Sequence, residues 1–270
     1  MLRERLRALH PGASGRGIKQ WLASGRVRVN GAVVRRGDAR VGPADRVELG
    51  RPEIAFPASL RLVQEDEHLL VVEKPAGLLT IATDRERSRT VYRLLRDWAE
   101  AQGDRRIFVV HRLDRETSGL LVFAKSWAAK RALQAQFQAR TPERVYVARV
   151  EGVVRADGGT LSSRLVEDRA LRVRPARGAR RGEDAITRYR VLERYPDTTL
   201  LELALVTGRR GQIRAQLAAL GHPIVGDRAY GSRRDPLRRV CLHATRLGFV
   251  HPSGRRVVFD SPPPPGFRRA

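Results

Sequence analysis

Several residue types that define whole classes of protein are scarce in this sequence. It contains one cysteine, Cys241, which excludes an intramolecular disulfide and any metal cluster held by several thiolates. The apolar runs, such as residues 69–72, reach only four or five residues. A transmembrane helix needs about 20, so we expect no membrane association. The first residues, MLRERLRALHPG, lack the apolar core of a signal peptide, and we therefore expect a cytoplasmic protein.

Lysine and acidic residues are also few relative to arginine. Lysine accounts for 4 of the 53 basic residues, and 29 acidic residues leave a net charge of +24 at pH 7. A surplus of this size attracts polyanions and speeds their capture, which favours a nucleic acid as the partner. An anionic membrane surface fits less well, because no segment has the pattern of a basic amphipathic anchor. Hydrophobic residues make up 41% of the 270, as in a folded globular protein.

The motifs of several familiar enzyme classes are missing. TGRRGQIR, residues 207–214, is rich in glycine and arginine but lacks the Gly-Lys-Ser/Thr of a phosphate-binding loop. HRLDRETSG, residues 111–119, lacks the asparagine and the companion motifs of a kinase catalytic loop. The chain has no G-x-S-x-G elbow, and its few histidines do not have a clear metal-ligand spacing. We therefore expect no cofactor and no metal, so that any chemistry depends on side chains alone.

Residues 1–50 have the pattern of a small separate module. Residues 18–22 predict a short amphipathic helix, and Asn30-Gly31 is a strong turn signal between two alternating runs, RVRVNG and AVVRRGD. A further strand is expected at residues 47–50. Residues 51–59 contain two prolines and predict a linker.

Residues 60–270 predict a single mixed domain. Helical periodicity occurs at residues 91–101, 126–140 and 212–220, and Gly221 is suited to end the last helix. Strand-like runs outnumber the helices and follow one another, which favours an α+β fold with a largely antiparallel sheet. These runs are LLVVE, IFVVH, GLLVFA, VYVARVEG, ITRYRVL, TLLELAL and RVVF.

Two segments of this domain predict little regular structure. Residues 164–181 hold seven arginines and few apolar residues, which predicts an exposed hairpin or loop. Such a segment is either a solvated face or an RNA contact. The final PPPPGFRRA, residues 262–270, predicts an extended end without chemistry.

The segment FVVHRLDRETSGLLVFAK, residues 108–125, has two apolar runs on either side of a polar insert. The insert contains His111, Arg112, Asp114 and Glu116. An insert at strand ends places charged side chains beside the core, where functional groups often lie. A charged turn held by arginine–carboxylate pairs would give the same pattern, so the residues alone leave both interpretations open.

This segment closely resembles the aspartate motif of the RluA-type pseudouridine synthases. LLVVEKPAGLLT (69–80) is similar to the first motif of that family, and RVYVARVEG (144–152) to its tyrosine strand. Residues 205–231 are similar to its arginine helix and the following loop. The resemblance covers nearly all of residues 60–265 and implies the α+β pseudouridine synthase fold. One departure is Arg210-Gly211, which replaces the usual Thr-His before Gln-Ile-Arg.

The resemblance implies that the chain isomerises uridine to pseudouridine in a structured RNA. It makes Asp114 the catalytic carboxylate, as nucleophile or as base, and Arg214 its charge partner. Tyr146 should lie against the target base, unless it is an ordinary core tyrosine. The nucleotide must leave the stack, and Arg112 is suited to fill the space that it vacates. We expect Lys74 to support the turn of KPAG rather than to take part in the chemistry.

The N-terminal module has a resemblance of its own. SGRGIKQ and GRVRVNG, residues 14–20 and 25–31, are similar to the S-four type RNA-binding domain that precedes many of these synthases. This resemblance implies RNA contacts by four basic residues, Arg16, Lys19, Arg26 and Arg28. The usual Gly-Asp of the domain is Ala44-Asp45 here.

We expect a monomer that binds RNA, with large-subunit ribosomal RNA favoured by the N-terminal module and transfer RNA as the alternative. Two other functions stay open. A basic RNA-binding or ribosome-assembly factor without catalysis would have no use for Asp114, Tyr146 and Arg214 together. DNA binding would depend on the basic surface alone, since no segment has the pattern of a major-groove recognition helix.

Overall fold

The computed structural model describes residues 1–50, 55–84, 86–102, 106–168, 173–176 and 182–268. The chain divides into two compact units, Met1–Ala58 with Leu94–Arg106, and Ser59–Arg93 with Ile107–Ala270. Part of the predicted linker, residues 51–54, lies outside the described residues, and the predicted domain boundaries stay a prediction. In the described ranges, no helix combines the length and the apolar character needed to cross a membrane.

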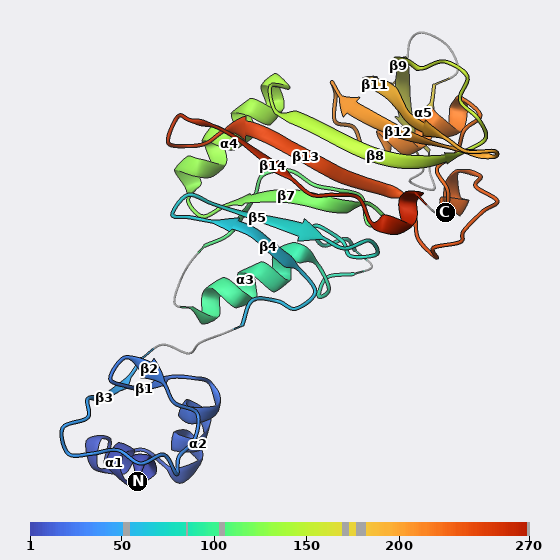
Figure 1. The fold of residues 1–270 in the computed structure, drawn as a ribbon. Coiled ribbons are helices and arrows are strands. Elements are labelled where there is room, and N and C mark those ends of the chain that lie inside the picture. The colour runs from blue at the N-terminus through green and yellow to red at the C-terminus, as the bar shows by residue number, and fades with distance from the viewer. Residues whose placement is uncertain (51–54, 85, 103–105, 169–172, 177–181, 269–270) are drawn as a thin grey trace. The chain divides into compact units, whose positions relative to one another are not determined.

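Residues 1–50 of the smaller unit form two helices and a three-stranded antiparallel sheet (Figure 1). These elements are α1 (Leu2–Leu9), α2 (Gly15–Ala23), β1 (Val27–Val29), β2 (Ala32–Val33) and β3 (Val47–Leu49). Asn30 and Gly31 join β1 to β2 with φ of 52° and 82°, the left-handed backbone that an Asn-Gly hairpin turn requires. The core consists of Leu2, Leu6, Ile18, Leu22 and Val27. The sequence patterns do not predict α1, because only two leucines mark its buried face.

The larger unit is built on a sheet with 11 described strands. They are β4 (Arg61–Glu65), β5 (Leu69–Lys74), β6 (Phe108–Val109), β7 (Ser118–Ala124), β8 (Glu143–Glu151), β9 (Gly158–Glu167), β10 (Val173–Pro175), β11 (Glu183–Arg194), β12 (Thr198–Leu205), β13 (Leu242–Val250) and β14 (Arg256–Asp260). Their order is β10-β9-β11-β12-β8-β13-β7-β5-β4, with β14 beside β13 and β6 beside β7. Among these pairs only β13 and β7 run parallel, and the predicted α+β fold with a largely antiparallel sheet is confirmed.

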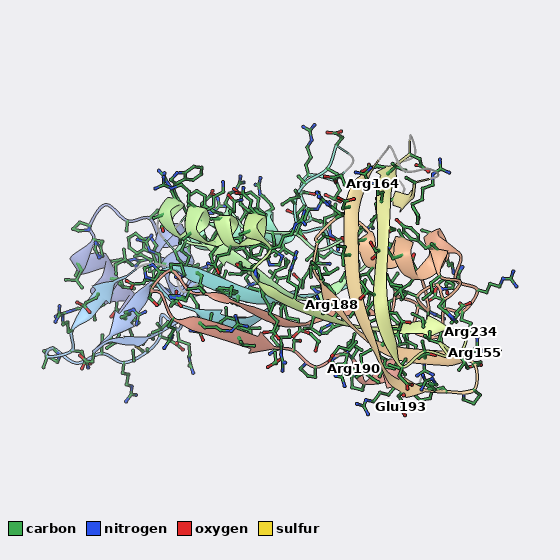
Figure 2. All side chains as sticks on the ribbon, turned by 90° about the horizontal axis from the view of Figure 1, so that it is seen from above. Arg155, Arg164, Arg188, Arg190, Glu193 and Arg234 are labelled. Atoms are coloured by element: carbon green, nitrogen blue, oxygen red, sulfur yellow. The ribbon has the colours of Figure 1, made fainter. Side chains whose placement is uncertain are left out.

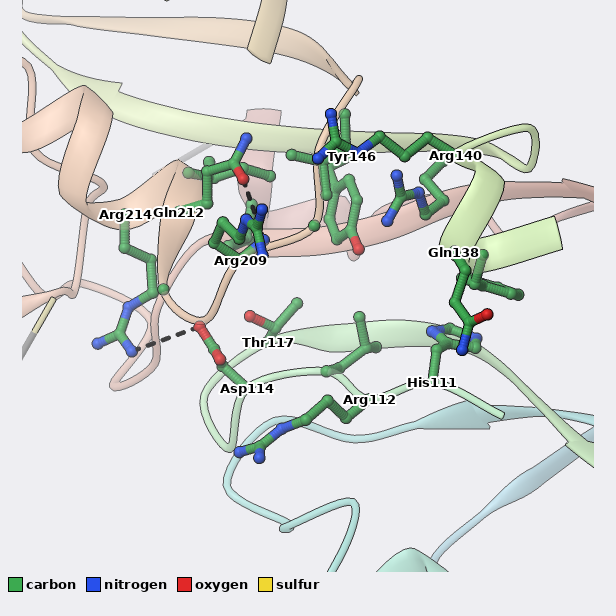
Figure 3. Close-up of a pocket in the computed structure, with 18 residues that line it drawn as sticks. His111, Arg112, Asp114, Thr117, Gln138, Arg140, Tyr146, Arg209, Gln212 and Arg214 are labelled. Atoms are coloured by element: carbon green, nitrogen blue, oxygen red, sulfur yellow. Dashed lines mark hydrogen bonds and ion pairs between the residues drawn. The ribbon is translucent and has the colours of Figure 1, made fainter. Parts of the chain in front are cut away.

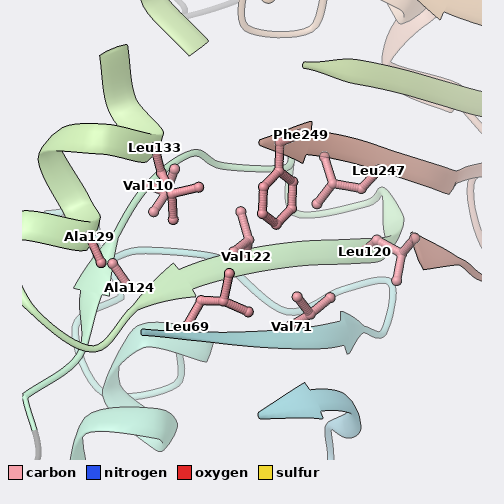
Figure 4. Close-up of a cluster of buried hydrophobic side chains, with 10 residues drawn as sticks. All are labelled: Leu69, Val71, Val110, Leu120, Val122, Ala124, Ala129, Leu133, Leu247 and Phe249. Carbon is pink, nitrogen blue, oxygen red and sulfur yellow. The ribbon is translucent and has the colours of Figure 1, made fainter. Parts of the chain in front are cut away.

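Helices cover this sheet at two places. α4 (Trp127–Ala139) begins at Ser126, whose hydroxyl accepts a hydrogen bond from Ala129 N at 3.1 Å. Its residues Ala129 and Leu133 pack on the core of β5, β7 and β13 (Figure 4). α5 (Gln212–Ala219) packs Ala215 against the strands β9, β10 and β11. The boundary between the two units falls within α3 (Val91–Ala101), between Arg93 and Leu94.

Two of the sequence expectations for the larger unit need correction. Residues 164–181 do contribute to a hairpin, β9–β10, but Leu165 and Val173 are buried rather than exposed, because they pack with α5. Residues 169–172 and 177–181 lie outside the described residues. The tail is not a free extended end. Residues Pro265–Arg268 form a 3-10 helix, Phe267 is fully buried, and its carbonyl accepts a hydrogen bond from Arg149 at 2.9 Å.

Candidate active site

The loop that carries Asp114 lies between β6 and β7 and is held by backbone hydrogen bonds. The hydroxyl of Thr80 donates to the carbonyl of Leu113 at 2.9 Å and accepts from its N–H at 3.1 Å. Thr117 N donates to the carbonyl of Asp114 at 3.2 Å, which closes a tight turn. The side chain of Asp114 is 20% exposed. The loop therefore presents one partly desolvated carboxylate from a fixed backbone.

Just after this loop, Gly119 allows two strands to approach unusually closely. Its φ is 116°, and a Cβ at this position would lie 2.3 Å from the carbonyl oxygen of Ala244. No side chain fits in that space. Gly119 therefore permits the parallel contact of β7 with β13, which fixes the strand that follows the Asp114 loop.

Lys74, at the end of β5, supports the loop that carries Asp114 through hydrogen bonds to backbone carbonyls. It is fully buried, and its Nζ donates to the carbonyls of Pro75 at 2.8 Å, Leu78 at 2.7 Å and Arg115 at 3.0 Å. Burial lowers the pKa of Lys74 to about 7, while the charges of Glu116 and Asp114 favour its ammonium form. Three carbonyl acceptors match the three N–H bonds of that ammonium. These contacts agree with the structural role that the sequence analysis gives to Lys74.

We expect Lys74→Met to destabilise the protein by about 1–3 kcal/mol, because three partly buried carbonyls then lose their donor. Activity should fall in proportion to the loss of folded protein. Denaturant unfolding and the rate per folded molecule check this. A Lys74→Met protein with unchanged stability would show that the three hydrogen bonds do not hold the loop.

Arg214, on α5, lies near Asp114 but pairs more closely with another carboxylate. Its Nη1 is 3.8 Å from Asp114 Oδ2, whereas its Nε and Nη2 donate to the two oxygens of Asp227 at 2.7 and 2.8 Å. The guanidinium also lies 4.7 Å from the ring centroid of Tyr230. Burial alone would lower the pKa of Arg214, but the hydrogen bonds and charge of Asp227 raise it above its ordinary value. Asp227 therefore fixes a permanent positive charge beside Asp114.

The departure from the family pattern at Arg210-Gly211 fits this arrangement. Gly211 precedes α5 with φ 58°, and a Cβ there would lie 2.9 Å from the hydroxyl of Tyr230. Arg210 points to Glu167 and donates to it at 2.7 Å. A larger residue at position 211 would therefore displace the ring that contacts Arg214.

Asp114 and Arg214 line a cavity of about 380 Å³ (Figure 3). The lining comes from the Asp114 loop, the end of α4, the strands β8, β12 and β13, and the start of α5 with the segment before it. It consists of His111, Arg112, Leu113, Asp114, Thr117, Phe137, Gln138, Arg140, Arg144, Tyr146, Leu205, Gly208, Arg209, Gly211, Gln212, Ile213, Arg214 and Leu242. Five of these side chains are arginines and one is a carboxylate. The cavity is therefore suited to a negatively charged ligand that meets a single acidic group.

Tyr146 and Arg112, which the sequence analysis names as substrate-binding residues, both line this cavity. Tyr146 projects from β8 with its hydroxyl end in the cavity, and 8% of the residue is exposed. Burial raises the pKa of Tyr146 to about 12, so the ring stays a neutral phenol at pH 7. Arg112 is exposed and has no carboxylate partner among the described residues.

His111 also lines the cavity but is held as a neutral structural group. Its ring stacks on Phe137 at 4.5 Å, and its Nε2 accepts a hydrogen bond from Val122 N at 3.3 Å. Burial lowers the pKa of His111 to about 3. Among the described lining residues, Asp114 is thus left as the group that can act as a base or a nucleophile at neutral pH.

The sequence analysis misses several residues of this site. Asp227, Arg140, Arg144 and Arg209 are absent from its candidates. Arg144 could have been found, because it lies two residues before Tyr146 and a strand places such residues on the same face. Burial lowers the pKa of Arg144, and its Nε is buried without a hydrogen-bond partner.

The four basic residues predicted to bind RNA lie in the smaller unit. Arg16 and Lys19 are exposed on α2, without a carboxylate partner in the described part of the chain. Arg26 Nε donates to the carbonyl of Gly50 at 3.1 Å, and Arg28 Nη1 donates to that of Gly31 at 3.0 Å. Arg26 and Arg28 therefore also hold the small sheet together.

Comparisons with known proteins show the family to which this chain belongs. Residues 68–219 match the family model described as RNA pseudouridylate synthase. The chain is 37% identical to ribosomal large subunit pseudouridine synthase D of Pseudomonas aeruginosa, over 96% of this chain and 87% of that protein. It is 37% identical to the dual-specificity RNA pseudouridine synthase RluA of Pasteurella multocida, over 76% of this chain and 93% of that protein. The solved structure of human RNA Pseudouridylate Synthase Domain Containing 1 is similar with a TM-score of 0.63 and 28% identity, covering 75% of this chain and 83% of that one. The chain therefore belongs to the RNA pseudouridylate synthase family of isomerases, as its RluA-type motifs predict.

Proposed function

We propose that this protein converts uridine to pseudouridine in structured large-subunit ribosomal RNA, in the cytoplasm and as a monomer. The observation that carries the proposal is the cavity itself, whose lining contains one carboxylate, Asp114, and five arginines. Such a cavity attracts the phosphates of RNA and offers one group for chemistry on the sugar or base. The name of the Pseudomonas aeruginosa relative supports the ribosomal target.

The reaction breaks the glycosidic C–N bond, turns the base and forms a C–C bond to the same sugar. Asp114 serves as nucleophile or base, and Arg214, fixed by Asp227, keeps positive charge beside it. Tyr146 is buried and neutral, which suits a ring that stacks on the target base. Arg112, exposed at the cavity, takes the place of the extruded nucleotide.

A direct assay tests this function. Purified full-length protein is incubated with large-subunit ribosomal RNA transcribed without modifications, and the nucleosides are analysed by mass spectrometry. We expect pseudouridine at one or a few defined positions. Transfer RNA transcripts form the second arm, and modification there alone would move the target to transfer RNA. Absence of pseudouridine in both RNAs would contradict the proposal and favour a binding factor without catalysis.

The smaller unit adds RNA contacts in this proposal, as an S-four type RNA-binding domain. Arg16 and Lys19 are the exposed members of its predicted set and are free to meet phosphates. Because each lost phosphate contact flattens the plot of log affinity against log salt by about 0.7–0.9, the variant Arg16→Ala with Lys19→Ala should have a visibly shallower slope. The control is Arg36→Ala, which removes an exposed arginine already paired with Asp38 at 2.9 Å. Equal slopes in the wild type and the double variant would remove these two residues from the RNA interface.

A further inference from the structure

The outer face of α4 carries an exposed aromatic side chain that the catalytic cavity does not use. Trp127, the first residue of the helix, is 55% exposed. One edge contact joins it to Phe108, with ring centroids 5.9 Å apart. Lys130 Nζ lies 4.3 Å from the centroid of its ring. A large, flat and largely exposed side chain such as Trp127 offers a stacking surface to a partner.

The charges of α4 are of one sign. The helix contains Lys130 and Arg131 and has no Asp or Glu. Arg131 is exposed, and no carboxylate of the described residues pairs with it. The partner that fits this face is therefore a polyanion that also has flat rings, which describes a single strand of RNA.

The same face leads to the catalytic cavity. Trp127, Arg131, Gln134 and Gln138 follow one another at intervals of four, three and four residues, which places them along one side of the helix. Gln138 and the following Arg140 line the cavity, as Figure 3 shows. The opposite side of α4 is turned inward, because Ala129 and Leu133 pack in the core (Figure 4). From Trp127 to Gln138 the helix rises by about 16 Å, a span of a few nucleotides.

We propose that this stripe of α4, composed of Trp127, Lys130, Arg131, Gln134 and Gln138, binds the RNA strand next to the target uridine, with an unpaired base stacked on Trp127. This proposal rests on the proposed function in one respect, namely that the nucleotide in the cavity is the target uridine. Lys130 and Arg131 meet the phosphates, and Gln134 and Gln138 lie between them and the cavity. The stripe thus selects RNAs in which the target uridine has an unpaired neighbour.

Crosslinking of the wild-type protein tests the contact without any knowledge of the target uridine. Full-length protein is irradiated with total cellular RNA, and the crosslinked peptides are identified by mass spectrometry. We expect an adduct at Trp127. Crosslinks confined to residues outside α4 would overturn the proposal. A partner protein bound to the outer face of α4 in place of RNA would also overturn it.

Variants measure how much the stripe contributes to RNA affinity. Loss of one base–aromatic stack weakens RNA binding by about tenfold to a hundredfold, which is the expected rise in Kd for Trp127→Ala. Trp127→Phe should restore most of the affinity, because it keeps a ring. Arg131→Ala should reduce the salt slope by about 0.7–0.9. The matched control is Arg155→Ala, which removes an exposed arginine near β9 and β11, away from α4 (Figure 2).

The outcomes separate this proposal from the proposed function. Wild-type protein that modifies ribosomal RNA while Trp127→Ala and Arg131→Ala bind it within twofold of wild type would overturn the stripe alone. The wild-type protein could instead leave ribosomal RNA unmodified, yet give the Trp127 crosslink and the Kd changes with total RNA. That result would show that ribosomal RNA is not the target, and it would support the stripe. Equal losses in Arg155→Ala and Arg131→Ala would reduce the effect to net charge and contradict the stripe.

Discussion

Asp114→Asn should abolish pseudouridine formation and leave RNA affinity and stability nearly unchanged. The amide keeps the size and polarity of the side chain but loses the charge and the nucleophilicity that the reaction needs. Since Asp114 is partly exposed and Arg214, its closest cation in the described part of the chain, is 3.8 Å away, the ion pair contributes little to folding. Single-turnover assays on a substrate RNA, with binding and unfolding curves in parallel, measure the three effects separately.

Glu116→Gln is the matched control for this substitution. It makes the same change two residues further along the loop, at a side chain outside the cavity lining. Glu116 pairs loosely with Arg115, at 3.7 Å, and its charge favours the ammonium form of Lys74, so unfolding curves are compared as well. We expect it to keep most of the activity. Substantial turnover by Asp114→Asn, or equal losses in the two variants, would remove Asp114 from the centre of the mechanism.

Arg214→Ala should lose both activity and stability. Asp227 is 1% exposed and would be left as a buried charge without its bidentate partner. Removal of one partner of a buried ion pair costs about 3–5 kcal/mol. Arg214→Lys should recover only part of either property, because a lysine lacks the planar fork that reaches both oxygens of Asp227.

A double-mutant cycle with Asp227→Asn distinguishes the two roles of Arg214. The pair Arg214→Ala with Asp227→Asn should regain part of the unfolding free energy, since no buried charge remains unpaired. Activity should stay lost, because the charge beside Asp114 is still missing. A fully active Arg214→Ala protein would show that this charge has no part in catalysis.

The sequence predicted the elements whose local signals are strong. Residues 91–101 match α3 in full, and 126–140 exceed α4 by one residue at each end. Apolar residues at helical spacing mark both helices directly, and Ser126 also caps the start of α4. The apolar run before Lys125 likewise became β7, whose residues are all buried. The four residues that the motifs single out, Asp114, Tyr146, Arg112 and Arg214, all line one cavity.

The partners of these residues could not be predicted in the same way. Asp227 lies 13 residues after Arg214, and only the return of the chain after α5 brings the two together. Arg140, Arg144 and Arg209 come from three different segments, and in a chain so rich in arginine no single one stands out. Phe267 was missed because a proline-rich tail gives no periodic signal for a single buried ring.

Uridine isomerisation by this protein should depend on the Asp114 cavity. A map of pseudouridine across ribosomal and transfer RNA tests this directly, in cells that lack this protein and in the same cells complemented with either wild type or Asp114→Asn. We expect that one or a few large-subunit sites disappear without the protein, return with the wild type and stay absent with Asp114→Asn. Identical maps in all strains, or sites restored by Asp114→Asn, would contradict it.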